Sequence, residues 1–235
     1  MNKERLKTGL EMMGVAADET ALDRFEAFHA ILDEYNARMD LTAVLDEDER
    51  VDRHDLDSAA PLAHGLLAQG AKVIDVGTGA GFPGLALKIA CPDMELTLLD
   101  SLDKRIGFLR DTCALLGFDD VRCIHARAEE APAELHAGFD IACSRAVARL
   151  NLLCELCLPL AKKGGVFIAM KGPDCADELN AAKRAIKLLG GEVEDVKKYL
   201  VPGTDATHSA IIIRKTADTP AKYPRRWAQI KKQPL

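Results

Sequence analysis

Three closely spaced glycines behind an aspartate form the segment best suited to chemistry. Residues 73–76 are an apolar run that contains Asp75, and three glycines follow it at once: Gly77, Gly79 and Gly81. Glycine permits a tight turn and a close approach of the backbone to a ligand, while the apolar run fits a buried parallel strand. Pro83 suits the first turn of a following helix. Strand, glycine loop and helix together predict a site for a nucleotide-type cofactor.

The loop admits more than one interpretation. Gly79, Gly81 and Gly84 match the GxGxxG spacing of dinucleotide-binding folds, in which a pyrophosphate lies at a helix N-terminus. Counted from Asp75 instead, the acidic residue and its glycines resemble the first motif of Rossmann-like methyltransferases, whose loop wraps the amino-acid half of S-adenosylmethionine (SAM). A glycine-rich surface turn that binds nothing is the third interpretation.

Other candidate cofactor contacts follow the next strands of the pattern. Asp100 ends a predicted strand about 20 residues beyond the loop, the interval at which an acidic residue bonds a ribose hydroxyl, although a helix cap would use the same residue. Ala128 and Glu129 follow a strand at the place where many such folds contact an adenine edge. Glu129 could equally be a first-turn acid that the helix dipole favours. Arg145 lies where substrate enters, at the carboxyl end of the fourth strand.

That fourth strand end also limits the acceptor. It lacks the Asn/Asp-Pro-Pro-aromatic motif of exocyclic-amine methylases, and because Cys143 follows Ala142 it lacks the Pro-Cys of cytosine-C5 RNA methylases. We therefore expect Cys143 to be a buried structural thiol and no nucleophile. Guanine N7 fits better, because its free lone pair needs no general base and orientation can supply most of the catalysis.

Composition predicts a soluble, cytoplasmic protein. The 235 residues are 48% hydrophobic, enough for one sizeable domain plus an extension. No stretch approaches the roughly 18 uninterrupted apolar residues of a membrane span, and the first residues form no apolar signal segment. Cys154 and Cys157 form a CxxC without a second ligand pair, so we predict no metal site.

The charge is divided unevenly along the chain. Residues 211–235 carry a net charge of +6, whereas the remainder carries −12. This asymmetry favours a basic element that binds a polyanion, although a solvated tail that touches nothing would have the same composition.

Apolar periodicity predicts helices and strands in alternation. A helical prefix, 1–70, contains helices near 18–38, with Asp18 as cap, and near 58–68, with Asp57 or Ser58 as cap. Strands then fall near 72–76, 95–100, 121–125, 139–143 and 165–170, with helices near 83–91, 103–117, 150–160 and 175–189. We divide the chain into this prefix, a SAM-binding domain at 71–215 and a basic tail at 216–235.

The end of the pattern separates the two cofactor classes. Residues 192–200 and 210–213 predict two strands without a helix between them, hence a hairpin at the sheet edge. Methyltransferase sheets typically end in this way, whereas dinucleotide-binding sheets continue with parallel strands and helices. The expected fold is therefore α/β, a Rossmann-like class I methyltransferase with a seven-stranded, mostly parallel sheet, an antiparallel last strand and an N-terminal helical extension.

Motifs spread over nearly the whole chain resemble the RsmG (GidB) family of bacterial 16S rRNA guanine-N7 methyltransferases. They are residues 40–44, 53–58, 75–84, 144–147, 170–172 and 223–226 with the terminal Pro234-Leu235. The resemblance implies SAM as cofactor and one guanine of small-subunit rRNA near the decoding site as acceptor. It also implies cofactor contacts at Gly77, Phe82, Ala128, Glu129 and Arg145. Asp40, Ala228 and Ile230 depart from the usual pattern, which leaves the conformation of the tail open.

Basic residues supply the candidate RNA contacts. Cations can neutralise phosphates while Tyr223 or Trp227 stacks on a base; the candidates are Arg53, His54, Lys171, Arg225, Arg226, Lys231 and Lys232. His54 could instead be a core or capped histidine and Lys171 a solvated strand end. Arg145 is expected to hold the cofactor or the O6 face of guanine.

Two other functions stay open on the residues alone, a nicotinamide-dependent oxidoreductase and a non-enzymatic RNA-binding protein. The expected partner is 16S rRNA or the small ribosomal subunit, as naked RNA, an assembly intermediate or the complete particle. We expect a monomer.

Overall fold

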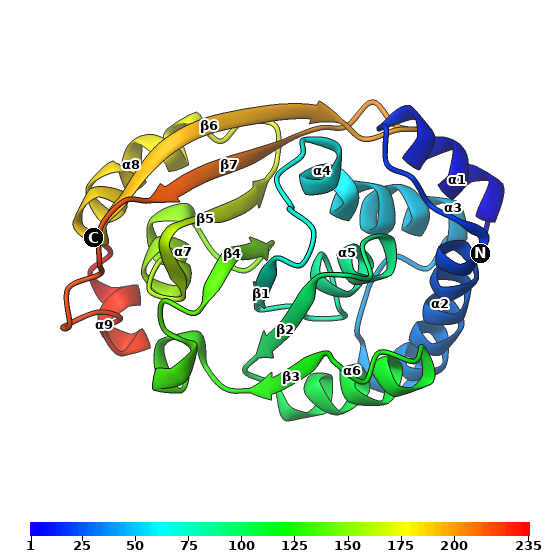
Figure 1. Cartoon of the computed structure of the whole chain (residues 1–235), viewed down its shortest axis with the longest axis horizontal. Helices are drawn as coiled ribbons and strands as arrows, with labels where there is room; N and C mark the ends of the chain where they lie inside the picture. The colour runs from blue at the N-terminus through cyan, green and yellow to red at the C-terminus, as the bar shows by residue number, and fades with distance from the viewer.

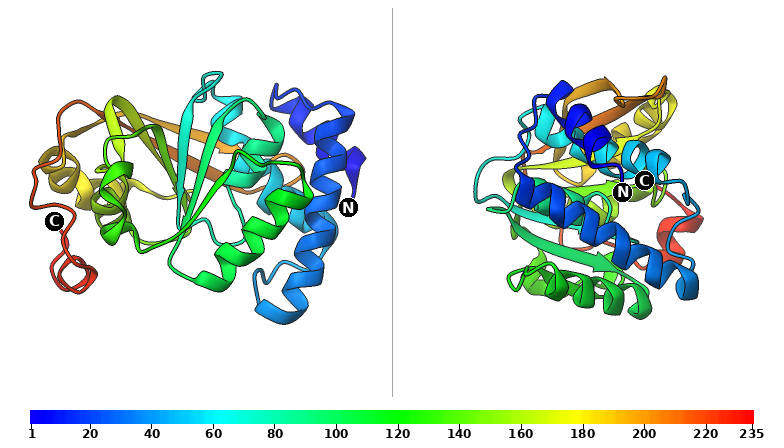
Figure 2. Two further views of the ribbon diagram at one scale, coloured as in Figure 1. Left: turned by 60° about the horizontal axis from the view of Figure 1, so that its bottom comes forward. Right: turned by 90° about the vertical axis from the view of Figure 1, so that its right-hand side faces the viewer.

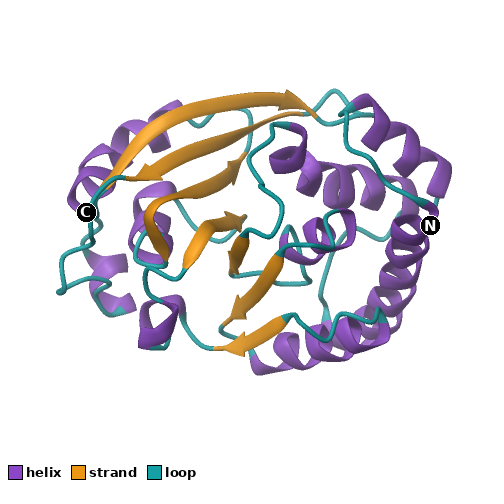
Figure 3. Ribbon diagram, in the orientation of Figure 1, coloured by secondary structure: helices purple, strands orange, loops and turns teal.

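A computed structural model describes residues 1–235 and shows one seven-stranded sheet in the order β3-β2-β1-β4-β5-β7-β6 (Figures 1 and 3). The strands are β1 Lys72–Val76, β2 Glu95–Asp100, β3 Arg122–His125, β4 Phe139–Arg145, β5 Ala161–Lys171, β6 Gly191–Leu200 and β7 Thr207–Lys215. Strands β1 to β5 are parallel. The predicted class I methyltransferase fold is confirmed.

The terminal hairpin is also confirmed, and the structure shows its register. Strand β7 lies between β5 and β6 and runs antiparallel to both, so that Tyr199 of β6 stands opposite His208 of β7. The hairpin extends further than predicted, because β7 spans Thr207–Lys215 where 210–213 was expected, while β6 begins only one residue before the expected 192–200. It therefore brings polar side chains toward the carboxyl ends of the parallel strands.

Helices cover both faces of the sheet, as the alternating pattern requires. Alternate residues of a strand face opposite sides: Val73 joins one hydrophobic cluster and Ile74 the other. Helices α5 Gly84–Ala90 and α6 Asp103–Leu115 lie on the first face, and α7 Leu150–Cys157 and α8 Ala176–Leu188 lie on the second. The 3₁₀ turns η2 Ala128–Glu130 and η3 Ala133–Leu135 connect β3 to β4.

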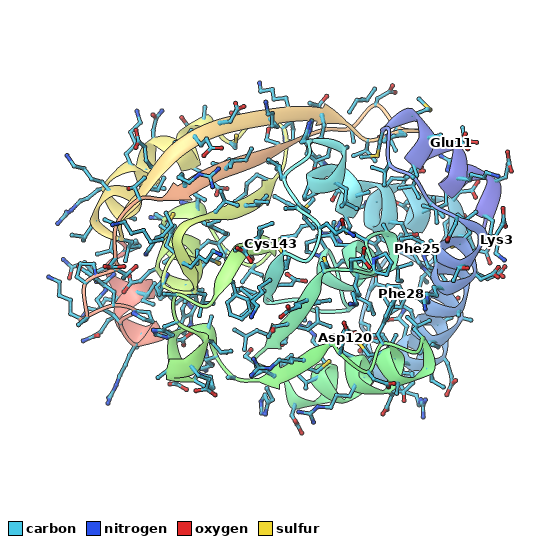
Figure 4. All side chains as sticks on the ribbon, in the orientation of Figure 1. Lys3, Glu11, Phe25, Phe28, Asp120 and Cys143 are labelled. Atoms are coloured by element: carbon cyan, nitrogen blue, oxygen red, sulfur yellow. The ribbon has the colours of Figure 1, made fainter.

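The N-terminal helices pack on the α5 and α6 side. They are α1 Lys3–Met12, α2 Glu19–Met39, α3 Glu47–Arg50, the π-helical turn η1 Val51–Leu56 and α4 Asp57–Ala63. Asp18 caps α2 as predicted, because its side chain accepts a hydrogen bond from the Ala21 N–H. Figure 4 shows Phe25 and Phe28 on the side of α2 that faces the sheet, where both are buried.

One predicted cap is wrong. Neither Asp57 nor Ser58 caps a helix, because η1 runs directly into α4 without a side-chain cap, and α4 ends earlier than predicted. The carboxylate of Asp57 is used in the site described below.

The C-terminal segment ends in the short helix α9 Trp227–Lys232, which packs against α7. Figure 2 shows α9 and the N-terminal helices at opposite ends of the molecule. The buried Ile230 belongs to the same hydrophobic cluster as α7 and α8, so the segment is more than a solvated tail. No helix has the length and apolar character needed to cross a membrane. The three-part division of the chain stays a prediction, since α1 and α2 share one hydrophobic cluster with the sheet.

Candidate active site

The glycine loop after β1 needs glycine for conformation and for space. Gly77, Gly79 and Gly81 all have positive φ, at 74°, 61° and 98°, a region that other L-residues rarely adopt. A Cβ on Gly77 would lie 2.5 Å from Cγ2 of Val147. At Gly81 a Cβ would press on Leu109 and Phe28 at 3.1 and 3.3 Å. A side chain at Gly77 or Gly81 would therefore press on Val147, which follows β4, or on Leu109 of α6 and Phe28 of α2.

A cavity of about 460 Å³ opens beside this loop at the carboxyl ends of β1, β2 and β4. This is the place at which open parallel sheets bind their ligands, and the volume is within the range of cofactor sites. Seven of the nine predicted cofactor-binding residues line it: Gly77, Gly79, Phe82, Asp100, Ala128, Glu129 and Arg145.

The other two, Asp75 and Gly81, lie beneath the loop and do not line the cavity. Asp75 has no exposed surface, and its Oδ2 accepts a hydrogen bond of 2.8 Å from the N–H of Gly84. Burial raises the pKa of the Asp75 carboxyl to about 6. In this structure Asp75 joins β1 to the start of α5, so it shapes the loop rather than touching what the loop holds.

The carboxylate of Asp100 accepts hydrogen bonds from two backbone N–H groups. Its Oδ1 accepts from the N–H of Leu102 at the start of α6, and its Oδ2 accepts from the N–H of Gly79 at 3.0 Å. The carboxylate thus couples β2 to the glycine loop while it borders the cavity. A ribose hydroxyl contact for Asp100 stays a prediction.

Arg145, at the end of β4, is held between η1 and the glycine loop. Its Nη1 donates to Asp57 Oδ2 at 2.7 Å and to the backbone oxygen of Arg53 at 2.9 Å. Its guanidinium lies 5.5 Å from the centroid of the Phe82 ring, within cation–π distance. The end of β4 is therefore pinned by contacts from two other parts of the chain.

His54 stacks on the same ring, with centroids 4.6 Å apart. Its Nε2 is 2.9 Å from Thr42 Oγ1, and its Nδ1 is 3.5 Å from Arg145 Nη2. Burial, with the nearby charge of Arg145, lowers the pKa of the His54 imidazole to about 4, so the ring is neutral near pH 7.

A second cavity of about 750 Å³ meets the first at His54, Arg145 and Ala146. Its wall includes Asp57, whose Oδ1 accepts from the Tyr199 hydroxyl at 2.8 Å and pairs with His208 Nδ1 at 2.7 Å. Burial opposes ionisation of Asp57, but the hydrogen bond from His208 and the charge of Arg145 outweigh it and lower the pKa of this carboxyl. The same hydrogen bond raises the pKa of His208.

Cys143 is a buried thiol, as predicted. The residue is buried in the sheet, as Figure 4 shows, and burial raises the pKa of its thiol well above the ordinary value. A thiol in this setting is no nucleophile.

The predicted RNA-binding residues separate into two groups. Arg53, His54 and Lys171 line the second cavity, although Lys171 pairs with Glu178 at 2.8 Å. Arg226, Lys231 and Lys232 are exposed on and beside α9.

Arg225 differs from the sequence prediction. Its guanidinium is bound to the buried carboxylate of Glu155 on α7, with Nη2 to Oε2 at 2.6 Å and Nε to Oε1 at 2.8 Å. Its charge is therefore neutralised within the chain and is not free for a phosphate in this structure.

The sequence did not predict the roles of several residues of the site. The polar run around His54 could have singled out Asp57, but its role as an acceptor for three donors depends on η1, a π-helical turn without a sequence signature. Tyr199 and His208 meet Asp57 only through the register of the hairpin. Trp227 was expected near RNA bases, and the structure places it in the wall of the first cavity.

Comparison with known proteins decides the family. A family model described as GidB, rRNA small subunit methyltransferase G, matches residues 21–205. The chain belongs to this family. Ribosomal RNA small subunit methyltransferase G of Alkaliphilus metalliredigens (strain QYMF) is 43% identical over 236 residues, which cover 100% of this chain and 99% of that protein. The protein of the same name from Lactobacillus johnsonii (strain CNCM I-12250 / La1 / NCC 533) is 43% identical and covers 100% of both chains.

Solved structures show the same fold at low sequence identity. A SAM-dependent methyltransferase from Aquifex aeolicus has a TM-score of 0.53 at 18% identity, over 72% of this chain and 94% of that one. TYW2 of M. jannaschii, solved with AdoMet, has a TM-score of 0.56 at 11% identity, over 74% and 79% of the two chains. As a member of the RsmG family, the protein is an enzyme, a methyltransferase. The comparisons lend no support to the oxidoreductase or to the non-enzymatic alternative.

The first cavity fits SAM on its own geometry. Its floor is a loop with no side chain at Gly77 and Gly79, so backbone can approach the ligand closely. Asp100 and Glu129 add acceptors suited to hydroxyl and amine groups, and Phe82 adds an apolar surface. These are the features that a small, polar nucleoside with a charged amino-acid end requires.

Proposed function

We propose that this protein transfers a methyl group from SAM to N7 of one guanine of 16S rRNA, close to the decoding site of the small ribosomal subunit. The observation that carries the proposal is the meeting of two cavities at His54, Arg145 and Ala146. One cavity is bounded by the glycine loop, and the other is bordered by Arg53 and Lys171. A methyl donor and a nucleotide can therefore approach each other across a single junction.

The chemistry of the junction favours a ring nitrogen that carries no proton. SAM supplies an electrophilic methyl group, and an amine or a carbon acceptor would also need a group to take its proton. Both imidazole nitrogens of His54 have partners, and the oxygens of Asp57 are bound by Arg145, Tyr199 and His208. Neither residue is free to act as a base. N7 of guanine needs none, so holding it in line is the main task of the site.

The side chains have separate parts in this account. The cofactor is bound by the seven predicted residues that line the first cavity, Gly77, Gly79, Phe82, Asp100, Ala128, Glu129 and Arg145. Asp75 and Gly81 shape the loop from below. Arg145 lies at both cavities, so it also orients the guanine, because a guanidinium can donate to O6 while it leaves N7 free.

Basic side chains guide the RNA. Arg53 and Lys171 border the second cavity beside the neutral ring of His54, and the exposed cations Arg226, Lys231 and Lys232 extend the basic surface along the C-terminal segment. We further propose that the protein works as a cytoplasmic monomer without a metal. Both cavities are built from one chain, and no group of three or more His, Cys, Asp or Glu side chains is placed to hold a metal ion. A mass of 25.5 kDa by light scattering, unchanged by EDTA, is the expected result.

The test is transfer of label from methyl-labelled SAM into RNA. Naked 16S rRNA, assembly intermediates and complete small subunits from a strain that lacks the enzyme should be compared as acceptors. We expect label in small-subunit RNA from that strain and none in RNA that is already methylated. Label in large-subunit RNA, or NADH binding that S-adenosylhomocysteine does not displace, would contradict the proposal.

A further inference from the structure

Trp227 lies in the wall of the first cavity, although it belongs to a segment far from the glycine loop in sequence. It lines the same cavity as Leu156 of α7 and the residues Ala128 and Glu129 of η2. It is the single tryptophan of the chain, and it is partly buried against the cluster that contains α7 and α8. An indole ring is large, flat and apolar, and such rings pair favourably with nucleobases.

The segment that carries Trp227 is fixed to the rest of the protein at two places and is tied internally by a further hydrogen bond. Ile230 is fully buried, and the Arg225 backbone N–H and side chain all donate to the buried carboxylate of Glu155. Arg225 Nη1 also donates to the backbone oxygen of Gln233 at 3.1 Å, which ties the far end of α9 to the same residue. Without the Arg225 side chain, the buried Glu155 would lose its ion-pair partner and keep only the hydrogen bond from the backbone N–H of residue 225.

The contacts of the neighbouring elements agree with this placement. Helix α7 packs against both η2 and α9, so one helix supports the two elements whose residues line this cavity; α7 and α9 are labelled in Figure 1. Glu129 is almost fully shielded, with 4% of its side chain exposed, and it faces the same cavity. The cavity therefore has an aromatic ring and an acceptor for an amine on two elements that both pack against α7.

We propose that Trp227 closes the adenine end of the cofactor cavity and that the bond between Arg225 and Glu155 holds it there. Trp227 is in this account a cofactor-binding residue, and Arg225 is a positioning residue that acts through it. The inference rests on the proposed placement of adenine beside Ala128 and Glu129, and it is independent of which base of which RNA is methylated. Stacking of Trp227 on an RNA base is the competing outcome.

The single tryptophan makes the test direct. With the full-length protein, S-adenosylhomocysteine and adenosine should each change the emission of Trp227, whereas L-methionine should not, because it reaches only the other end of the cavity. Calorimetry should show that Trp227→Ala weakens binding of S-adenosylhomocysteine by about tenfold, in keeping with the stacking of one base. Trp227→Phe should stay within about threefold of the unmodified protein.

Matched variants separate the contact from folding. Gln229→Ala changes an exposed residue of the same helix and should leave the affinity for S-adenosylhomocysteine unchanged. Arg225→Ala should weaken that affinity and shift the emission of Trp227 to the red in the absence of RNA, while circular dichroism stays that of a folded protein. Arg225→Lys should restore part of both.

The outcomes are distinguishable. Unchanged affinity for S-adenosylhomocysteine in Trp227→Ala, together with reduced RNA affinity, would place the ring on RNA and overturn the inference alone. Emission that responds to methionine but not to adenosine would overturn it as well. Failure of the unmodified protein to bind S-adenosylhomocysteine would overturn the cofactor site itself.

Discussion

Asp57 is the residue on which the junction between the cavities depends. Its carboxylate accepts from Arg145, Tyr199 and His208, three side chains from β4, β6 and β7. Hydrogen bonds to a buried charged group are stronger than neutral ones, and leaving a partner unsatisfied costs more than the bond contributes. One residue of α4 thus fixes the end of the parallel sheet relative to the hairpin.

Asp57→Asn should therefore lower both activity and stability. An amide offers one acceptor oxygen and turns its NH₂ toward groups that are themselves donors, so Arg145 loses its ion pair. We expect methyl transfer to fall at least tenfold and the free energy of unfolding in urea to fall by about 3 kcal/mol. Asp205→Asn, at an exposed residue of the same cavity without an ion pair, should change stability by less than about 0.5 kcal/mol. Equal effects of the two variants would contradict this role of Asp57.

His54 should remain neutral well below the pH at which an ordinary histidine is protonated. Its folded pKa is lowered to about 4, whereas an unfolded histidine titrates near 6.5. The unfolded state therefore takes up the proton first, and stability decreases as the pH falls from about 6.5 to 4. Relative to the His54→Gln variant, the free energy of unfolding of the unmodified protein should decrease by on the order of 3 kcal/mol over that pH range. An NMR titration of the His54 imidazole with a midpoint near 6.5 would contradict this prediction.

At the scale of elements, the sequence predicted the features that depend on local pattern and missed those that depend on long-range register. The strand and helix order from β1 to α8 follows from apolar periodicity, and Asp18 and the glycine loop act as their residue types imply. The π-helical turn η1 and the pairing of Tyr199 with His208 depend on tertiary contacts, and no local signal marks them. Seven of the nine residues that the sequence predicted to bind the cofactor line one cavity, whereas the sequence analysis missed the cluster around Asp57.

A substitution in the glycine loop tests whether the loop needs glycine for its conformation and for space. Gly77→Ala should weaken binding of S-adenosylhomocysteine by about tenfold or more, because the new Cβ meets Val147 at 2.5 Å and φ is 74°. Val147→Ala in the same chain removes the contact but not the backbone strain, so calorimetry should show partial recovery. Full recovery, or no effect of Gly77→Ala alone, would contradict the account of the loop.

At the scale of the whole molecule, fewer cations are free than the sequence count suggests. Residues 211–235 have a net charge of +6, but Arg214 is paired with Glu194, Arg225 with Glu155, and Lys215 is buried against the Leu189 carbonyl. The cations left without an ion pair are Lys222, Arg226, Lys231 and Lys232. Composition overestimated the basic surface because it cannot distinguish a cation that holds the fold from one that faces solvent.

Removal of two of these cations should change the salt dependence of RNA binding. Each phosphate contact contributes about −0.7 to the slope of log K against log salt for single strands. Lys231→Ala with Lys232→Ala should therefore reduce that slope by about 1.4 in a filter-binding titration. The pair Lys183→Ala and Arg184→Ala, exposed on α8, should leave it unchanged. A slope that moves equally in both pairs would mean that binding follows net charge alone.

The central claim is that the methyl group arrives at N7 of one guanine. Small-subunit RNA from a strain without the enzyme should be incubated with the protein and SAM, digested to nucleosides and analysed by mass spectrometry, with reduction and aniline cleavage to locate the modified position. We predict 7-methylguanosine and strand cleavage at a single guanine near the decoding site. Methylation of another base, of another atom of guanine, or of many guanines would contradict the account.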